Sequence, residues 1–269
     1  AKFIPMPMLV STALYFAAER WGDGEARYDY RAQAKRLLAD VLHRQPITGK
    51  TARGEMTAVN LFDHEAKMVR FTPDLANAAH TDASYHLPAF YEVWARVGPQ
   101  ADRAFWREAA QVSRDYFARA AHPQTALTPD YGNFDGTPWA APWRPESADF
   151  RYDAWRSAMN WSVDWSWWAV DPRQVEMSNR LQAFFEAQGM ADYQSLYTLD
   201  GKPLGGGQTT GLVATNAVAS LAADHPRRLA FVRALWEQPV PSGQTAPDGP
   251  RLSSRRRTAG SMVVSHSCS

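Results

Sequence analysis

Residues 82–120 read DASYHLPAFYEVWARVGPQADRAFWREAAQVSRDYFARA, and this stretch decides the fold class. Apolar side chains recur at helical spacing before and after Pro99, which predicts two helices with a short connection. The first helix is expected to run through Leu87 and Trp94, and the second to span Asp102 to Ala120. Short connections favour antiparallel neighbours, so the stretch indicates a helical hairpin.

The same periodicity recurs along most of the chain, and strand alternation is nearly absent. Further helices are predicted at 8–20, 30–43, 152–168, 172–188, 211–222 and 226–236. A short hairpin is indicated where 57–62 meets 68–71. The long proline-rich stretch 122–149 is expected to form a cleft wall. About eight sequential helices favour an all-α toroid or bundle over any sheet fold.

Composition excludes several classes of function. The chain has 269 residues, 45% of them hydrophobic, which is enough for a substantial core. Lys and Arg number 29 against 28 Asp and Glu, so we expect no nucleic acid or anionic lipid partner. No apolar run approaches about 18 residues, so a soluble protein without a membrane span is expected, in the cytoplasm, the periplasm or outside the cell. Cys268 alone cannot form a disulfide framework.

Aromatic residues are the most informative excess. The chain has 11 Trp, 10 Tyr and 12 Phe, many of them beside Asp, Asn, Gly and Pro rather than within apolar runs. A flat apolar body with a polar tip suits both the faces and the hydroxylated edges of sugar rings. Core packing is expected to account for roughly two thirds of these aromatics. The remainder favour a carbohydrate ligand.

Three aspartates are candidates for the two carboxylates that glycosidic hydrolysis needs. Asp82 precedes a predicted helix, where its alternative role is to cap backbone amides. Asp153 stands among aromatics near Arg156, with a surface salt bridge as its alternative role. Asp164 lies eleven residues later, a spacing that puts it on the same helix face as Asp153, or it is a buried partner of an arginine.

Other chemistries find little support in the sequence. His86 has no second histidine at ligand spacing, so a hydrogen-bonded core histidine is favoured over a metal ligand. Gly205 to Gly207 lack the Walker lysine and a preceding strand, which favours a flexible loop over a phosphate-binding loop. No metal and no cofactor are predicted.

Three segments read together resemble glycoside hydrolase family 8. They are DASYHLPAFY at 82–91, PDYGNFDGTP at 129–138 and YDAWR at 152–156. Their order and spacing also agree, and the similarity extends over about residues 13 to 243. Within the family, the chain is most similar to reducing-end xylose-releasing exo-oligoxylanases and related xylanases.

This resemblance implies an (α/α)₆ barrel and hydrolysis of β-1,4-xylosidic bonds in xylo-oligosaccharides or xylan, by an inverting mechanism without a metal. Asp153 matches the general base, and Tyr85 matches the tyrosine that holds the attacking water. Acid and base are then expected to lie about 6.5–9.5 Å apart. The residues expected to bind substrate are Asp82, Arg156, Tyr131, Tyr152 and Gln208.

The two ends of the chain depart from the family pattern. The general acid of relatives lies in a segment before the position of Ala1, and a substrate-binding aspartate is replaced near Pro5. Residues 1–243 are therefore expected to form a partial barrel, and residues 244–269 a polar, basic, disordered tail. Both ends are interpreted as truncated or frame-shifted, and Glu55 is not favoured as a replacement acid.

One internal departure leaves the mode of action open. Exo-acting relatives have Leu-His-Pro where this chain has Gly207-Gln208-Thr209. An endo-acting xylanase, a cellulase or a chitosanase therefore stays an alternative. Another alternative is a non-catalytic carbohydrate-binding or inactive fragment that lacks the general acid. The oligomeric state is left open.

Overall fold

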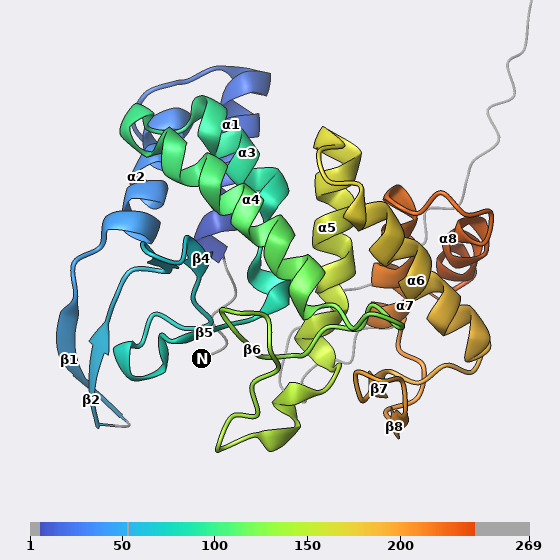
Figure 1. Ribbon diagram of the computed structural model, residues 1–269. Coiled ribbons are helices and arrows are strands. Elements are labelled where there is room, and N and C mark those ends of the chain that lie inside the picture. The colour runs from blue at the N-terminus through green and yellow to red at the C-terminus, as the bar shows by residue number, and fades with distance from the viewer. Residues whose placement is uncertain (1–5, 53, 240–269) are drawn as a thin grey trace, which may run out of the picture. The chain divides into compact units, whose positions relative to one another are not determined.

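The computed structural model describes residues 6–52 and 54–239 (Figure 1). The tail expected at 244–269 and Cys268 lie outside the described residues, so the prediction for them stays a prediction. All described helices and strands belong to one compact unit that ends at Gln238.

The described part of the chain contains eight α-helices, as the periodicity predicts. They are α1 Met6–Trp21, α2 Tyr30–His43, α3 Pro88–Val97, α4 Arg103–Ala120, α5 Trp155–Trp168, α6 Arg173–Ala187, α7 Thr210–Val218 and α8 Arg228–Trp236. Local signals set several of the ends: the Asp29 side chain accepts from the Ala32 amide at the start of α2, and Pro88 opens α3. The all-α fold class is confirmed.

Four small antiparallel two-stranded sheets lie in the loops between the helices. They pair β1 Ile47–Thr51 with β2 Gly54–Ala58, β3 Phe62–Asp63 with β4 Met68–Val69, β5 His80–Thr81 with β6 Gly132–Asn133, and β7 Leu196–Tyr197 with β8 Pro203–Gly205. One of them, β5 with β6, joins segments that are distant in sequence. The predicted hairpin is correct where Phe62 opposes Val69. It is wrong for Thr57, which opposes Thr48 because Ile47–Thr51 and Gly54–Ala58 form a separate hairpin.

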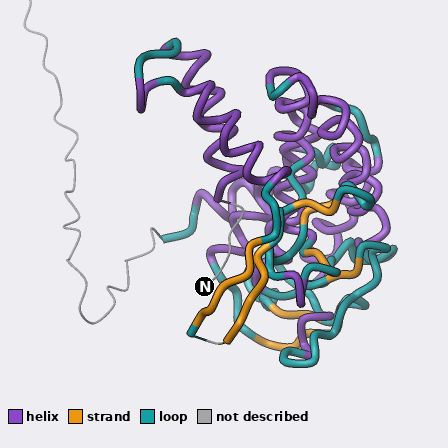
Figure 2. The backbone as a smooth tube through the Cα atoms, turned by 90° about the vertical axis from the view of Figure 1, so that its left-hand side faces the viewer, coloured by secondary structure: helices purple, strands orange, loops and turns teal. Residues whose placement is uncertain are grey.

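The helices pack mainly as neighbours in sequence, α1 on α2 and α3 on α4, while α5 contacts α3, α6 and α7. Two apolar clusters form the core. One surrounds Trp94 and Trp106 between the first four helices, and the other surrounds Trp161 and Phe185 near α5 to α8. β1, β2 and β5 to β8 lie below the helices in Figure 1, and the tube in Figure 2 follows the same strands and loops from the side.

A buried ion pair joins α4 to α5. Arg114 donates to both oxygens of Asp164, at 2.7 and 2.8 Å, and its other nitrogen donates to Glu92 of α3 at 2.9 Å. Gln174 of α6 donates to Asp164 at 2.7 Å. Side chains from four helices therefore meet at the Arg114–Asp164 ion pair. The alternative that Asp164 is a buried partner of an arginine is confirmed.

The same ion pair shows that Asp164 is not a second carboxylate of the candidate site beside Asp153. The predicted helix from residue 152 begins as a 3-10 turn, Tyr152–Ala154, and α5 starts only at Trp155. The spacing argument assumed one continuous α-helix, which the turn interrupts.

No helix among the described residues is long and apolar enough to cross a membrane.

Candidate active site

Asp82 follows β5 and is completely buried. One of its oxygens accepts from the Ser84 amide at 2.7 Å, so it caps the 3-10 turn Ala83–Tyr85 rather than the helix after it. Among the described residues, the other oxygen has no hydrogen-bond partner. The capping role is therefore confirmed in a modified form, and half of the carboxylate stays free for another task.

Asp130 is a site residue that the sequence analysis missed. Its carboxylate is 1% exposed and lies 3.2 Å from a guanidinium nitrogen of Arg144, which is 27% exposed. The backbone here is tied to the far end of the same loop, since the Asp130 amide donates to the Asp149 carbonyl at 2.9 Å. The sequence indicated that this loop was functional, but nothing in it distinguished Asp130 from its neighbours.

Asp153 is the accessible member of the group. It lies in the 3-10 turn before α5, with its side chain 37% exposed, and accepts from Arg156 at 2.9 Å. The expected salt bridge therefore exists, and its arginine also makes a second contact. Arg156 also donates to the Ser84 hydroxyl at 3.0 Å, which connects Asp153 to the turn that Asp82 caps.

The electrostatics indicate that these carboxylates lie close together. The pKa of Asp82 is raised well above its usual value, first by burial and then by the charges of Asp130 and Asp153, while Arg156 opposes this. The pKa of Asp130 is raised to about 6, mainly because burial outweighs the lowering effect of Arg144, and the charge of Asp153 adds to the rise. We call Asp82, Asp130 and Asp153 the carboxylate cluster.

Tyr85 lies beside the carboxylate cluster. Its ring stacks on Phe71 at 5.7 Å between centroids, and its side chain is buried. The pKa of its hydroxyl is raised, mainly by burial and then by the charges of Asp82 and Asp153. The structure therefore brings together Asp82, Tyr85, Asp153 and Arg156 as the sequence predicts, although it tests none of their expected roles.

We expect Asp82→Asn to increase the free energy of unfolding at pH 7 by about 1–3 kcal/mol. Asparagine keeps an oxygen for the Ser84 amide and has no charge to bury. A carboxyl group whose pKa is raised on folding gives stability that is present below about pH 4 and lost as the pH rises. The gain, measured by denaturant unfolding, should therefore disappear in acid.

Asp164→Asn is the matched control for this measurement, because Asp164 is equally buried but has Arg114 as its partner. It should destabilise the fold at pH 7. Equal stability of wild type and Asp82→Asn between pH 4 and pH 7 would contradict an electrostatic cost at Asp82.

Aromatic side chains surround one side of the cluster. Tyr131 lies 4.3 Å from Phe71 between ring centroids, and His80 lies 3.7 Å from Trp139. Burial lowers the pKa of His80 to about 4, which keeps its imidazole neutral at pH 7. Trp143 stands edge-on to Trp139 and is 59% exposed. Such rings can stack on sugar faces.

The remaining predicted substrate-binding residues fall into two groups. Tyr131 accepts a hydrogen bond from Arg144 at 3.2 Å, and the same guanidinium lies 5.3 Å from the Tyr152 ring centroid, so both tyrosines border the cluster. Gln208 lies in the loop before α7 and donates to the Met190 carbonyl at 3.0 Å. Among the described hydrogen bonds it makes none to the cluster, and its substrate-binding role stays a prediction.

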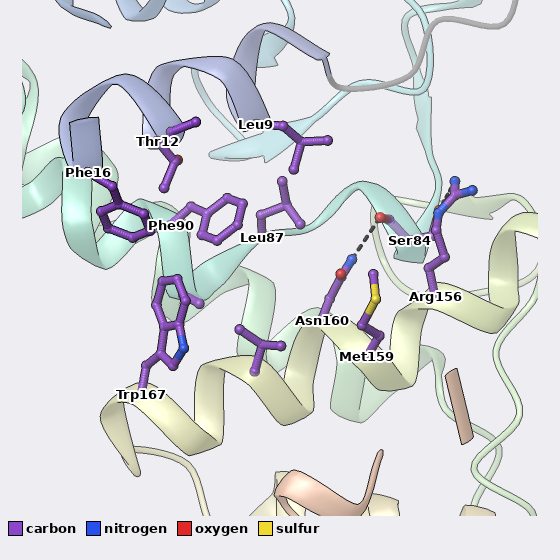
Figure 3. Close-up of a pocket in the computed structure, with 13 residues that line it drawn as sticks. Leu9, Thr12, Phe16, Ser84, Leu87, Phe90, Arg156, Met159, Asn160 and Trp167 are labelled. Atoms are coloured by element: carbon purple, nitrogen blue, oxygen red, sulfur yellow. Dashed lines mark hydrogen bonds between the residues drawn. The ribbon is translucent and has the colours of Figure 1, made fainter. Parts of the chain in front are cut away.

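A pocket of about 490 Å³ opens next to the cluster, between α1, α3 and α5 (Figure 3). Ser84 and Arg156 line its end nearest the cluster, where Asn160 donates to the Ser84 carbonyl at 2.7 Å. Apart from Thr12, the rest of the lining is apolar and includes Leu9, Phe16, Leu87, Phe90, Met159 and Trp167. No local sequence pattern indicates this pocket, because its walls come from three separate segments.

The side chains that the sequence analysis set aside behave as structural groups. His86 is fully buried and bonds Thr81 and Ser113 at 3.0 and 2.9 Å, which confirms a hydrogen-bonded core histidine. Gly206 has a φ of +91°, and a Cβ there would meet Leu196 at 3.0 Å, so this glycine allows a close approach within a loop. Within the described ranges, no group of three or more His, Cys, Asp or Glu could hold a metal ion.

Comparisons with known proteins identify relatives over most of the chain. The chain is 43% identical over 234 residues to the reducing-end xylose-releasing exo-oligoxylanase Rex8A of Paenibacillus barcinonensis, a match over 86% of this chain and 58% of the relative. It is 37% identical over 237 residues to a reducing-end xylose-releasing exo-oligoxylanase of Halalkalibacterium halodurans, over 86% and 57%.

A solved structure from Teredinibacter turnerae, a family 8 protein in complex with xylobiose, is also similar. It is 62% identical, with a TM-score of 0.87 over 89% of this chain and 61% of that one. The chain thus spans about three fifths of the length of the relatives it matches. This likeness supports the (α/α)₆ barrel as the architecture to which the eight described helices belong.

The family model for glycosyl hydrolases family 8 matches residues 7–230, a range that includes the whole carboxylate cluster and the aromatic side chains around it. The segments 82–91, 129–138 and 152–156 all lie within this match. The chain belongs to glycosyl hydrolases family 8.

Proposed function

We propose that the chain carries the water-activating half of an active site that hydrolyses β-1,4-xylosidic bonds with inversion. The observation that carries this proposal is the carboxylate cluster beside exposed and half-buried aromatic rings. Asp82 and Asp130 are buried, whereas Asp153 is 37% exposed and can reach a water molecule beside a bound sugar. Asp153 is therefore assigned the role of general base.

Each neighbour of Asp153 has a distinct task in this scheme. Arg156 holds the base in place through its 2.9 Å contact, and Tyr85 helps to orient the attacking water. Asp82 is assigned to the central subsite, where its second oxygen, unused among the described residues but buried, accepts a hydrogen bond from a sugar hydroxyl once the side chains over it shift. Tyr131 and Tyr152 border this subsite. The general acid is assigned to none of the described carboxylates.

Xylo-oligosaccharides are the proposed substrate, which the names of the exo-oligoxylanase relatives and the xylobiose complex support. The assay compares the purified chain with a version lengthened at its N-terminus by the corresponding segment of the Paenibacillus relative. Both are incubated with reduced and unreduced xylo-oligosaccharides, and the products are separated by chromatography. Release of xylose from unreduced substrates alone is expected from the longer protein, as reducing-end exo-hydrolysis requires.

The other outcomes of this assay decide between the alternatives. Internal cleavage would identify an endo-acting xylanase. Binding without cleavage by either version would favour a non-catalytic carbohydrate-binding protein. Cleavage of cello- or chito-oligosaccharides in preference to xylo-oligosaccharides would overturn the proposed substrate.

A further inference from the structure

The turn that carries Asp153 has a strained backbone. Tyr152, directly before Asp153, has a φ of +33°, a region that residues with large side chains rarely adopt. Such a conformation costs about 1–3 kcal/mol and persists only where the surroundings impose it. Contacts must therefore hold this turn in place.

The two flanks of the turn are fixed by ordinary contacts. On one side, Phe150 exchanges two backbone hydrogen bonds with Tyr197, at 2.9 and 3.2 Å. On the other side, Arg156 donates to the Ser84 hydroxyl at 3.0 Å. Between them, Tyr152 is 50% exposed, so these flanking contacts leave the strained residue itself open to solvent.

Arg144 reaches this open part of the turn from the loop before it. Its guanidinium lies 5.3 Å from the ring centroid of Tyr152, within range of a cation–π contact. The same group donates to the Tyr131 hydroxyl at 3.2 Å and pairs with the buried Asp130 at 3.2 Å. Its only other carboxylate among the described ion pairs is Glu146, at 3.9 Å.

The backbone of Arg144 is itself well anchored. Its amide donates to the Ala141 carbonyl at 2.8 Å, and its carbonyl accepts from the Ser147 amide at 3.0 Å. The Ser147 hydroxyl donates to the Trp139 carbonyl at 2.8 Å, and the Ser147 carbonyl accepts from the Tyr131 amide at 2.9 Å. The loop therefore presents the arginine from a fixed position.

Asp130 completes the connection. Its buried carboxylate pairs with Arg144 at 3.2 Å, and its backbone amide donates to the Asp149 carbonyl at 2.9 Å. Asp130 thus gives the arginine a buried ionic partner on a fixed segment of the same loop.

We propose that Arg144, anchored by Asp130 and Tyr131, is a positioning residue that holds the strained turn at Tyr152 and so fixes the carboxylate of Asp153. The expected effect of Arg144 on catalysis rests on the proposed role of Asp153 as general base. The expected effect of Arg144 on the turn does not, because the order of the turn can be measured without substrate.

The test replaces Arg144 with Met, which keeps a flexible apolar stem and removes the guanidinium. Hydrogen exchange at the amides of 152–155, followed by mass spectrometry, should become at least about tenfold faster because the turn opens locally. Arg227→Met is the matched control, since Arg227 is 20% exposed and pairs with Glu186 at 3.1 Å in another part of the fold. It should leave exchange at 152–155 unchanged.

Kinetics then separate positioning from other roles. In a version that hydrolyses xylo-oligosaccharides, Arg144→Met should lower kcat about tenfold or more and change KM by a smaller factor, because the base moves while the sugar contacts away from Tyr131 and Tyr152 remain. Unchanged exchange at 152–155 would overturn the proposal, and so would faster exchange with an unaltered kcat. If no version hydrolyses the substrate, the proposed function fails, and the exchange rates alone still decide whether Arg144 holds the turn.

Discussion

Replacement of Asp153 by Asn is expected to lower kcat for xylo-oligosaccharide hydrolysis by roughly 10²–10⁴-fold. The amide cannot accept the proton of the attacking water, so the loss reflects the missing base. The fold should survive, because Asp153 is partly exposed and its ion pair with Arg156 contributes little to stability. The measurement is the steady-state rate in the longer protein, with circular dichroism to verify the helices.

Asp149→Asn is the matched control for this substitution. Asp149 lies four residues earlier, is 26% exposed and pairs with Arg151 at 3.5 Å, so the same chemical change removes a similar surface charge. It should leave kcat within a small factor of wild type. Hydrolysis by Asp153→Asn at the wild-type rate would remove Asp153 from its assigned role.

The second large effect is expected at the centre of the fold. Arg114→Met should lower the free energy of unfolding by about 3–5 kcal/mol, because it leaves Asp164 and Glu92 without their shared cation. Both members of the Arg114–Asp164 pair are at most 2% exposed, so water cannot replace the lost partner. Denaturant unfolding at pH 7 measures the loss.

Arg31→Met gives the contrast, since Arg31 also pairs with two carboxylates, Glu19 and Asp23, but at the surface. It should change stability little. Replacing Asp164 with Leu in the Arg114→Met background should recover part of the loss, because the buried charge is then gone. Equal effects at Arg114 and Arg31 would show that burial does not set the strength of these ion pairs.

The helices could be predicted from sequence because each one satisfies its own backbone and exposes one apolar face. Tyr30–His43 was predicted to the residue, since Asp29 and Pro46 mark its two ends by local chemistry. The short strands were largely missed. His80–Thr81 pairs with Gly132–Asn133, some fifty positions away, and no local pattern records such a distant partner.

The same distinction between local patterns and distant contacts applies to the candidate site. Asp82 and Asp153 could be identified because their surrounding motifs resemble those of a known family. Asp130 could not, because its distinguishing features are burial and the approach of Arg144, which only the folded loop creates. Asp164 was ambiguous for a similar reason, since its partner Arg114 lies fifty residues earlier in the chain.

The carboxylate cluster also has an evolutionary consequence. Asp82 is a buried acid with no ion-pair partner among the described residues, and the charges of Asp130 and Asp153 oppose its ionisation, so selection for folding alone would favour its replacement by a neutral residue. A lineage released from the need to hydrolyse sugars should therefore lose this acid early, while it keeps the Arg114–Asp164 pair that holds its helices together. Among descendants of this gene, the identity at position 82 would then mark the loss of catalysis.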